Sequence, residues 1–233
     1  MLLCYSAAFS QKSQADSLAW QQAYLLSKQT YQNTLSGNSK VFNGVEYVNP
    51  LAKKRVMGHP NFISDDWQDG LLSFDGQLYE NVALQYNLLL NKVLIENVQS
   101  HATIELRNEM VDYFQIDNHT FVGLAGAIEG ESKDMFFDRL YNGVVKVYVK
   151  RYKTIKETAD QKVMVTEFLE KRKFYLFKDG RYINITNKKS ALNAFEAQKT
   201  AMKKLLSQQN INFRTTPELA LVTMATYYDK QLK

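Results

Sequence analysis

The chain has 233 residues, a length that suits one domain. Its hydrophobic fraction of 45% and charged fraction of 23%, with only 3 prolines and 10 glycines, exclude an intrinsically disordered chain and a low-complexity linker. The formal net charge of +5 is uneven, because residues 133–204 carry 18 Lys and Arg against 8 Asp and Glu. Such a surplus fits either a surface that faces a polyanion or an ordinary lysine-rich face in water.

The N-terminal residues indicate export. Residues 2–10 form a short uncharged run that ends in small residues, and a polar stretch follows it. This is the pattern at the end of a secretory signal peptide, although the basic segment that normally begins one is missing. We interpret residues 1–10 as a remnant of a signal peptide and residues 11–233 as a single domain, and we expect a periplasmic or secreted protein.

The same segment holds Cys4, the only cysteine of the chain. If the segment is removed, the mature protein has no disulfide and no thiol chemistry. No later stretch reaches the ~20 apolar residues that a membrane-spanning helix requires, so no transmembrane segment is expected.

The first elements expected after this segment are a helix and a hairpin. Aromatic residues recur at helical spacing over residues 16–35 and predict a helix, whose aromatic stripe suits a core-facing side or a partner groove. Residues 41–49 predict a short strand, or a hairpin that turns at Asn43-Gly44.

Three short apolar and aromatic runs predict an antiparallel meander. The runs cover residues 71–74, 78–86 and 93–96. Asp75-Gly76 lies between the first two runs and is a strong hairpin signal, because a tight primed turn needs positive φ, which glycine adopts without strain.

The strand pattern continues along the chain. Further candidates are residues 102–106, 120–124, 134–140, 144–152, 174–177 and 182–185. Asn142-Gly143 and Asp179-Gly180 predict that the last four candidates form two more hairpins. Residues 108–114 are ambiguous between a helical turn and a strand.

Two helices are expected at the C-terminal end. Residues 188–208 place apolar side chains roughly on one face, although Lys199 interrupts it. Thr216-Pro217 followed by a glutamate is a strong helix start, because threonine caps, proline fits the first helical position and an acidic residue suits the helix dipole. This last helix is expected to run to about residue 229.

The predicted fold class is therefore α+β and β-dominated. We expect an antiparallel meander that forms a sandwich or a half-open barrel, with an N-terminal helix and two C-terminal helices.

The alternation within residues 144–152 defines a candidate binding surface. Its valines are expected to face inward, and a Lys/Tyr set is expected on the opposite face of the strand. The members of that set are Lys146, Tyr148, Lys150 and Tyr152. Interleaved cations and aromatic rings suit an anionic polysaccharide, a lipid headgroup or an acidic protein, whereas nucleic acid is not expected for an exported protein. The ordinary alternative is a solvated strand face.

No catalytic or cofactor signature is present. The patterns typical of α/β-hydrolases, P-loop NTPases and Rossmann enzymes are absent. His59, His101 and His119 lack the spacing of metal ligands. Residues 123–132 are small and glycine-containing but have no basic residue, so they predict a mobile loop rather than a phosphate loop. We expect no metal and no cofactor.

Two groups of acidic residues leave alternatives open. Asp65, Asp66 and Asp69 could contribute oxygen ligands to Ca²⁺, but their spacing is more typical of turn residues. Glu129 and Glu131 could form a carboxylate pair for acid–base chemistry, but the sequence identifies no partner for them.

Several aromatic and glycine motifs carry a resemblance to a known group. In chain order they read FNGVEYV, GHPNF, GLLSFDG, YENVALQYN, VDYFQIDNHTF, RLYNGVVKVYVKRYK and FYLFKDGRYINI. Over about residues 41–204 the chain resembles a group of uncharacterised exported or periplasmic β-rich proteins of Bacteroidetes-type Gram-negative bacteria. That group has no established function, so the resemblance implies a location in the envelope or outside the cell, and it implies no activity or site residue.

These observations favour a non-catalytic cell-envelope or secreted protein that binds a partner or ligand through its sheet. The candidate partners are an envelope protein, an anionic glycan or a lipid. The alternatives are a hydrolase whose site is assembled from distant Asp, Glu and His residues, and a carrier of an apolar ligand in a β-cavity. The oligomeric state is left open.

Overall fold

A computed structural model of the protein describes residues 20, 22–23, 40–97, 99–160 and 163–232. These residues divide into two units, one within residues 1–43 and one from Gly44 onward, and each is described by itself. In the first unit, residues 20 and 22–23 are helical. The remainder of the helix predicted over residues 16–35 lies outside the described residues.

Of the two alternatives predicted for residues 41–49, the hairpin is wrong and the short strand is confirmed in part. η1 (Lys40–Phe42) is a 3-10 turn in place of its first arm. The only strand in this stretch is β1 (Val45–Glu46), and it pairs with a strand about sixty residues away along the chain rather than with its neighbour.

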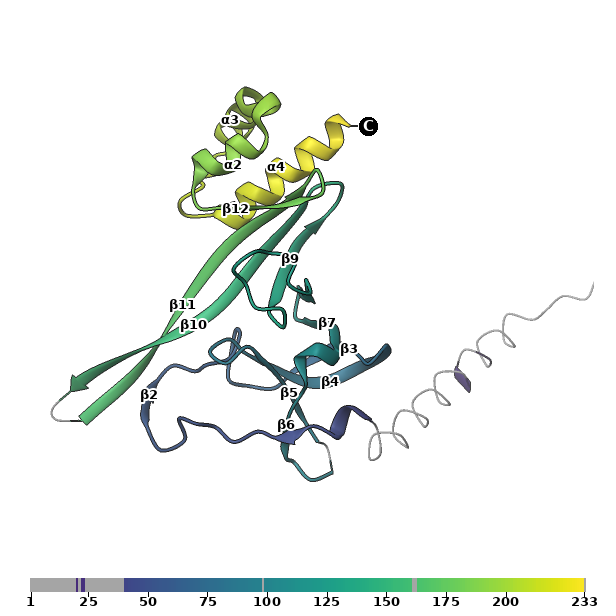
Figure 1. The fold of residues 1–233 in the computed structure, drawn as a ribbon, viewed down its shortest axis with the longest axis vertical. Helices are drawn as coiled ribbons and strands as arrows, with labels where there is room; N and C mark the ends of the chain where they lie inside the picture. Colours follow the sequence, from purple (N-terminus) through teal and green to yellow (C-terminus); the bar gives the residue numbers. More distant parts are fainter. Residues whose placement is uncertain (1–19, 21, 24–39, 98, 161–162, 233) are drawn as a thin grey trace, which may run out of the picture. The chain divides into compact units, whose positions relative to one another are not determined.

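The second unit is dominated by one open sheet (Figure 1). Its strands in the described residues are β1, β2 (Arg55–Met57), β3 (Gln68–Phe74), β4 (Gln77–Asn87), β5 (Lys92–Glu96), β6 (Thr103–Glu105), β7 (Val111–Ile116), β8 (His119–Gly123), β9 (Phe136–Asn142), β10 (Lys146–Asp160), β11 (Val163–Lys178) and β12 (Arg181–Ile185). They lie in the order β1-β6-β5-β4-β3-β7-β8-β9-β10-β11-β12, and β2 pairs with β11 off this path. The β2–β11 pair is parallel, and the pairs along the path are antiparallel.

The β-dominated class is confirmed, and so is the meander of β3, β4 and β5. The ambiguous stretch 108–114 contains both predicted conformations, because the 3-10 turn η2 (Asn108–Met110) leads directly into β7. The strands form an open sheet, and the described residues do not show the expected sandwich or half-open barrel.

Turn residues explain two of the hairpins in the way that the sequence predicted. Asp75 and Gly76 have φ of 51° and 72° between β3 and β4. Asp179 and Gly180 have φ of 51° and 76° between β11 and β12. Positive φ at both central positions is the geometry of a primed turn, whose twist matches that of the flanking strands.

The ribbon of β10 and β11 is much longer than predicted. The two strands have 15 and 16 residues, and their register runs without a break from Lys146 opposite Phe177 to Asp160 opposite Val163. The sequence predicted only its inner part. Beyond Lys153, threonine, lysine and glutamate occupy both faces of β10, so apolar alternation does not reveal the strand.

Three helices are described in the C-terminal part of this unit (Figure 1): α2 (Lys188–Ala194), α3 (Lys199–Gln208) and α4 (Pro217–Gln231). The single helix predicted over residues 188–208 is wrong, because the chain leaves helical geometry at Phe195 (φ −117°, ψ 44°) and continues through the 3-10 turn η3 (Glu196–Gln198). Phe195 is only 1% exposed, so the break lets an aromatic ring enter the core between two short helices.

The predicted start of α4 at Pro217 is confirmed, but the predicted cap is not. Thr216 accepts no capping hydrogen bond, and its hydroxyl donates to the carbonyl oxygen of Asn212 at 2.9 Å. No helix in the described residues is both long enough and apolar enough to cross a membrane.

Two apolar regions stabilise this unit. One is a cluster of interlocked aromatic rings from five segments: Phe62, Tyr86, Phe114, Phe121 and Phe136, with ring centroids 4.9–6.0 Å apart. The other lies between the sheet and the helices, where Val147, Leu176 and Ile185 belong to one buried cluster with Leu192 of α2 and Met224 of α4. Burial of each such side chain contributes roughly 1.5–3 kcal/mol.

Candidate functional site

The two faces of β10 have different surroundings, as the alternation of its residues predicts. Val147 and Val149 are fully buried, and Val147 belongs to the core beneath the helices. Tyr148 points to the other face and belongs to a second, smaller cluster. The inward orientation of the valines is therefore confirmed, and the Lys/Tyr set of the sequence lies on the face away from the helices.

The four predicted site residues line up along this face. Tyr148 is only 4% exposed. Lys146 Nζ lies 5.7 Å from the centroid of the Phe177 ring, and Lys150 Nζ lies 5.3 Å from the centroid of the Tyr152 ring. Cations and rings are thus interleaved in space as well as in sequence, at distances typical of cation–π contacts.

The segment 124–135 covers the middle of this face. Its Ile128 is 6% exposed and packs against Phe137, Tyr148 and Tyr175, which come from β9, β10 and β11. Of the mobile loop predicted over residues 123–132, Gly123 still belongs to β8, the rest has no helix or strand, and the apolar side chain of Ile128 holds it against the sheet.

Glu131 forms the polar centre of the same contact. Its carboxylate accepts hydrogen bonds from Lys150 Nζ, from Lys173 Nζ at 2.9 Å and from the Tyr175 hydroxyl at 2.7 Å. The side chain of Glu131 is only 5% exposed. Three donors from two adjacent strands thus converge on one carboxylate. Together these donors form a complete binding site for the carboxylate of Glu131.

These contacts shift the pKa values of the groups involved. Burial by itself would raise the pKa of Glu131, but the hydrogen bonds from Lys150, Lys173 and Tyr175 outweigh burial and lower that pKa to about 2. The hydrogen bond to Glu131 raises the pKa of Lys173. Burial and the same carboxylate raise the pKa of Tyr175. Glu131 is therefore ionised at neutral pH, which makes it unsuitable as the acid of a catalytic carboxylate pair.

An open cleft of about 960 Å³ lies beside this ion cluster. Its floor includes the rings of Phe177 and Tyr182, whose centroids are 4.9 Å apart, and Tyr182 also lies 6.0 Å from Tyr148. Its polar lining includes Glu129, Lys173, Arg181 and Asn184. Aromatic surface with a few convergent polar groups, at this volume, is the usual composition of a ligand site.

The residues of β11 and β12 that complete this face were not predicted from the sequence. Lys173, Tyr175 and Phe177 alternate in the same way as the residues of β10, and this alternation was the available signal. The register, which sets Tyr148 opposite Tyr175 and Phe177 opposite Tyr182, was not readable. That register is fixed by the pairing of the whole β10–β11 ribbon, which ends more than ten residues beyond Tyr148.

The three histidines have separate surroundings. His101 Nδ1 lies 3.0 Å from Glu96 at the surface, and no hydrogen-bond partner is found for the buried His59 Nδ1 among the described residues. The described residues contain no group of three or more His, Cys, Asp or Glu side chains that could hold a metal ion.

His119 is the one histidine beside a buried carboxylate. Its Nδ1 lies 2.7 Å from Asp138 Oδ2, and Arg151 Nε donates to the same oxygen at 2.8 Å. Arg151 also donates to both carboxylate oxygens of Glu218 in α4, at 3.0 and 2.9 Å, and Arg172 donates to Glu218 at 2.9 Å. The network joins β8, β9, β10 and β11 to α4.

The centre of this network is buried, and its outer members are partly exposed. The side chains of Asp138 and Arg151 are 1% and 6% exposed. Burial would raise the pKa of Glu218, but the hydrogen bonds and charges of Arg151 and Arg172 lower it, so the carboxylate stays ionised. The arrangement is one of paired charges that fix a helix to a sheet.

The chain matches no family model, no curated protein and no solved structure.

Proposed function

We propose that this is a non-catalytic binding protein of the cell envelope or the secreted fraction, and that it holds an anionic saccharide in the cleft on the β10–β12 face. The observation that carries the proposal is the aromatic floor of Phe177 and Tyr182 surrounded by Lys173, Arg181 and Asn184. The export part of the proposal is supported by the signal-like residues 1–10 and by the resemblance to exported proteins.

The aromatic floor favours a ring-shaped ligand. Phe177 and Tyr182 are both half-buried, so each ring leaves part of its surface to the cleft. Aromatic faces pack against the apolar C–H face of a sugar ring, while hydroxyl groups find partners in side chains such as Asn184. A purely apolar ligand would leave these polar groups without partners, which costs free energy.

The charges around the cleft favour an anion. Arg181 is exposed at the cleft, and no ion-pair partner of its guanidinium is found among the described residues. Lys146 adds a positive charge on the neighbouring strand, and Glu131, which also lines the cleft, is neutralised by Lys150 and Lys173. Glu129 is the remaining acidic residue of the lining. A uronate carboxylate would pair with Arg181 in a bidentate manner, for which the planar guanidinium is suited.

The proposal is tested by calorimetric titration with an oligogalacturonate and with a neutral galacto-oligosaccharide of matched length. We expect the uronate to bind and its affinity to fall as salt rises, because the charges at the cleft are partly exposed. Arg181→Gln should weaken binding by about tenfold or more, since a hydrogen bond to a charged group contributes roughly 1.5–3 kcal/mol. Tyr182→Ala should weaken binding by a similar factor.

The matched control is Lys156→Gln, an exposed cation on β10 that does not line the cleft. Equal effects of Lys156→Gln and Arg181→Gln would show only non-specific attraction to positive charge and would overturn the proposal. Equal binding of the neutral sugar would overturn the anionic part. Covalent capture of one dominant envelope protein, together with no binding of either sugar, would favour a protein partner instead.

The two alternative functions have less support. For the hydrolase, the described residues offer one histidine beside a buried carboxylate, His119 beside Asp138, but Arg151 pairs with the same carboxylate and joins it to Glu218 of α4. The apolar carrier requires a sheet that closes around a cavity, and the described strands form an open sheet.

A further inference from the structure

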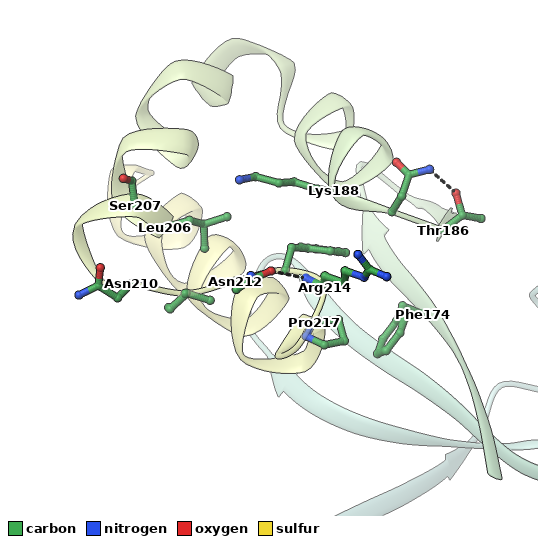
Figure 2. Close-up of a pocket in the computed structure, with 12 residues that line it drawn as sticks. Phe174, Thr186, Lys188, Leu206, Ser207, Asn210, Asn212, Arg214 and Pro217 are labelled. Carbon is green, nitrogen blue, oxygen red and sulfur yellow. Dashed lines mark hydrogen bonds between the residues drawn. The ribbon is translucent and has the colours of Figure 1, made fainter. Parts of the chain in front are cut away.

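A second groove, of about 730 Å³, lies on the opposite side of the sheet, among the C-terminal helices (Figure 2). It is bounded by the segment that leads from β12 into α2, by the C-terminal end of α3 and by the segment that precedes α4. Phe174 forms part of its wall and pairs with Ile185 of β12, whereas the next residue, Tyr175, belongs to the other face. The groove is therefore separate from the cleft of the proposed function.

The floor of this groove is apolar. Leu206 and Phe213 belong to the core beneath the helices, and they are 1% and 9% exposed. Phe174, Ile211 and Pro217 are half-buried and continue the apolar surface outward. Figure 2 shows the ring of Phe174 facing Pro217 at the start of α4. An apolar chain or ring laid here would lose water from both surfaces, which is favourable.

The rim of the groove is cationic. Lys188 and Arg214 line it, and its lining contains no Asp or Glu. Neither cation has an ion-pair partner among the described residues, unlike Arg151 and Arg172 of the buried network. Figure 2 shows the Lys188 ammonium and the Arg214 guanidinium pointing to opposite sides of the view, so the positive charge is spread along the rim.

The surrounding segment strengthens this positive field. Residues 186–233 carry eight Lys and Arg against three Asp and Glu. Two of these three carboxylates are engaged elsewhere, because Glu218 binds Arg151 and Asp229 accepts the backbone N–H groups of the β9–β10 turn. The 15-residue helix α4 also begins at the groove, at Pro217, and its positive end has no side-chain cap.

We propose that this groove binds an amphipathic carboxylate, such as a fatty acid. The apolar body lies on Phe174, Pro217 and the floor beneath them, the carboxylate pairs with Arg214, and Lys188 adds to the positive field of the rim. A carboxylate is favoured because the guanidinium fork matches its two oxygens, and because two free cations with no acidic neighbour leave a charge that an anion would neutralise. This proposal does not depend on the saccharide site.

The test is direct titration of the full chain with dodecanoate and with dodecanol, which has the same chain length and no charge. We expect dodecanoate to bind more tightly than dodecanol by a factor of about ten or more, because dodecanol cannot form a hydrogen bond between two charged groups at the rim. The double variant Lys188→Gln/Arg214→Gln should lose about tenfold in affinity for dodecanoate and should bind dodecanol as before. Lys203→Gln and Lys204→Gln, exposed cations of α3 outside the groove, should change neither affinity.

A filling variant locates the ligand. Ser207 is exposed and lines the groove, so Ser207→Trp should occlude it without removing charge or a core side chain. We expect Ser207→Trp to abolish dodecanoate binding while circular dichroism and the melting temperature stay close to those of the wild type. Tyr182→Ala, in the other cleft, should leave dodecanoate binding unchanged. The proposal is overturned if dodecanoate does not bind, if dodecanol binds equally well, or if Ser207→Trp binds like the wild type.

Discussion

Glu131 links a surface loop to the sheet through one ionised carboxylate. Its pKa of about 2 lies below the ordinary value of 4.5, so its contribution to stability is fully present above pH 4.5 and is lost as the pH falls toward 2. A shift of this size corresponds to roughly 3 kcal/mol before solvent screening. Because Lys173 is 45% exposed, solvent screens its pairing with Glu131, and we expect Glu131 to contribute about 1–2 kcal/mol to the free energy of unfolding.

The first prediction concerns Glu131→Gln. Urea unfolding at pH 7 should show a loss of about 1–2 kcal/mol in the free energy of unfolding, and the difference from the wild type should shrink as the pH falls toward 2. Glu129→Gln, a change of an exposed residue in the same loop, should stay within about 0.5 kcal/mol of the wild type. A Glu131→Gln deficit that is the same at pH 7 and pH 2.5 would contradict the assigned ion cluster.

Arg151 and Arg172 make a matched pair for the buried network. Both donate to Glu218, but only Arg151 also pairs with Asp138, and its side chain is 6% exposed against 46% for Arg172. Removing a buried partner leaves an uncompensated charge, so Arg151→Met should cost about 3–5 kcal/mol. Arg172→Met should cost about 0–1 kcal/mol, as for an exposed pair. Similar losses of unfolding free energy in the two variants would mean that the network is not buried as described.

At the scale of elements, Gly143 shows that a correct turn prediction can rest on the wrong reason. The Asn-Gly pair suggested a need for positive φ, but Gly143 does not have it. A Cβ at Gly143 would instead lie 1.9 Å from Asp229 Oδ2. That carboxylate accepts the N–H groups of Val144 and Val145 at 2.8 and 3.1 Å, so α4 approaches the hairpin too closely for any side chain.

The corresponding test is Gly143→Ala against Gly180→Ala. The first should cost about 2–4 kcal/mol, because it displaces a carboxylate from buried donors. The second meets nothing within 4 Å and keeps φ near +76°, so it should cost about 1 kcal/mol of conformational strain. Thermal melts of both variants measure the difference, and a larger loss for Gly180→Ala would refute the close approach of Asp229.

Helix caps provide a second comparison between elements. Asn187 accepts the N–H of Ser190 at 3.0 Å and Ser190 Oγ accepts the N–H of Asn187 at 3.0 Å, which is a reciprocal capping box at α2. Asn187→Ala should therefore cost about 1 kcal/mol. Thr216→Ala should cost less than about 0.5 kcal/mol, because the Thr216 side chain caps nothing. Chemical unfolding in which Thr216→Ala is the more damaging variant would contradict this assignment.

The elements also show where sequence patterns stop being informative. Asp75-Gly76 and Asp179-Gly180 are local signals, and the hairpins they predict are confirmed. The break at Phe195 is set by its burial between α2 and α3, and the outer half of the β10–β11 ribbon is set by its own continuous register. Those causes are tertiary, so helix propensity and apolar alternation within the sequence could not reveal them.

At the scale of the whole molecule, the sequence indicated one strand face of the candidate site and not what surrounds it. The Lys/Tyr alternation of β10 indicated which of its residues share a strand face, because a period of two is fixed by strand geometry. Which residues oppose that face depends on registers with β11 and β12, and what covers it depends on Ile128 and Glu131 in a loop with no secondary structure. Neither the cleft nor the carboxylate site could therefore be inferred from the sequence.

The central claim is that ligand binding occurs at the cleft beside the loop 124–135. Amide hydrogen exchange with and without oligogalacturonate tests it over the whole chain at once. We expect added protection in residues 124–135 and in the β11–β12 hairpin, with no change in α2, α3 or the groove near Arg214. Protection confined to other segments, or no change at saturating oligogalacturonate, would contradict the account.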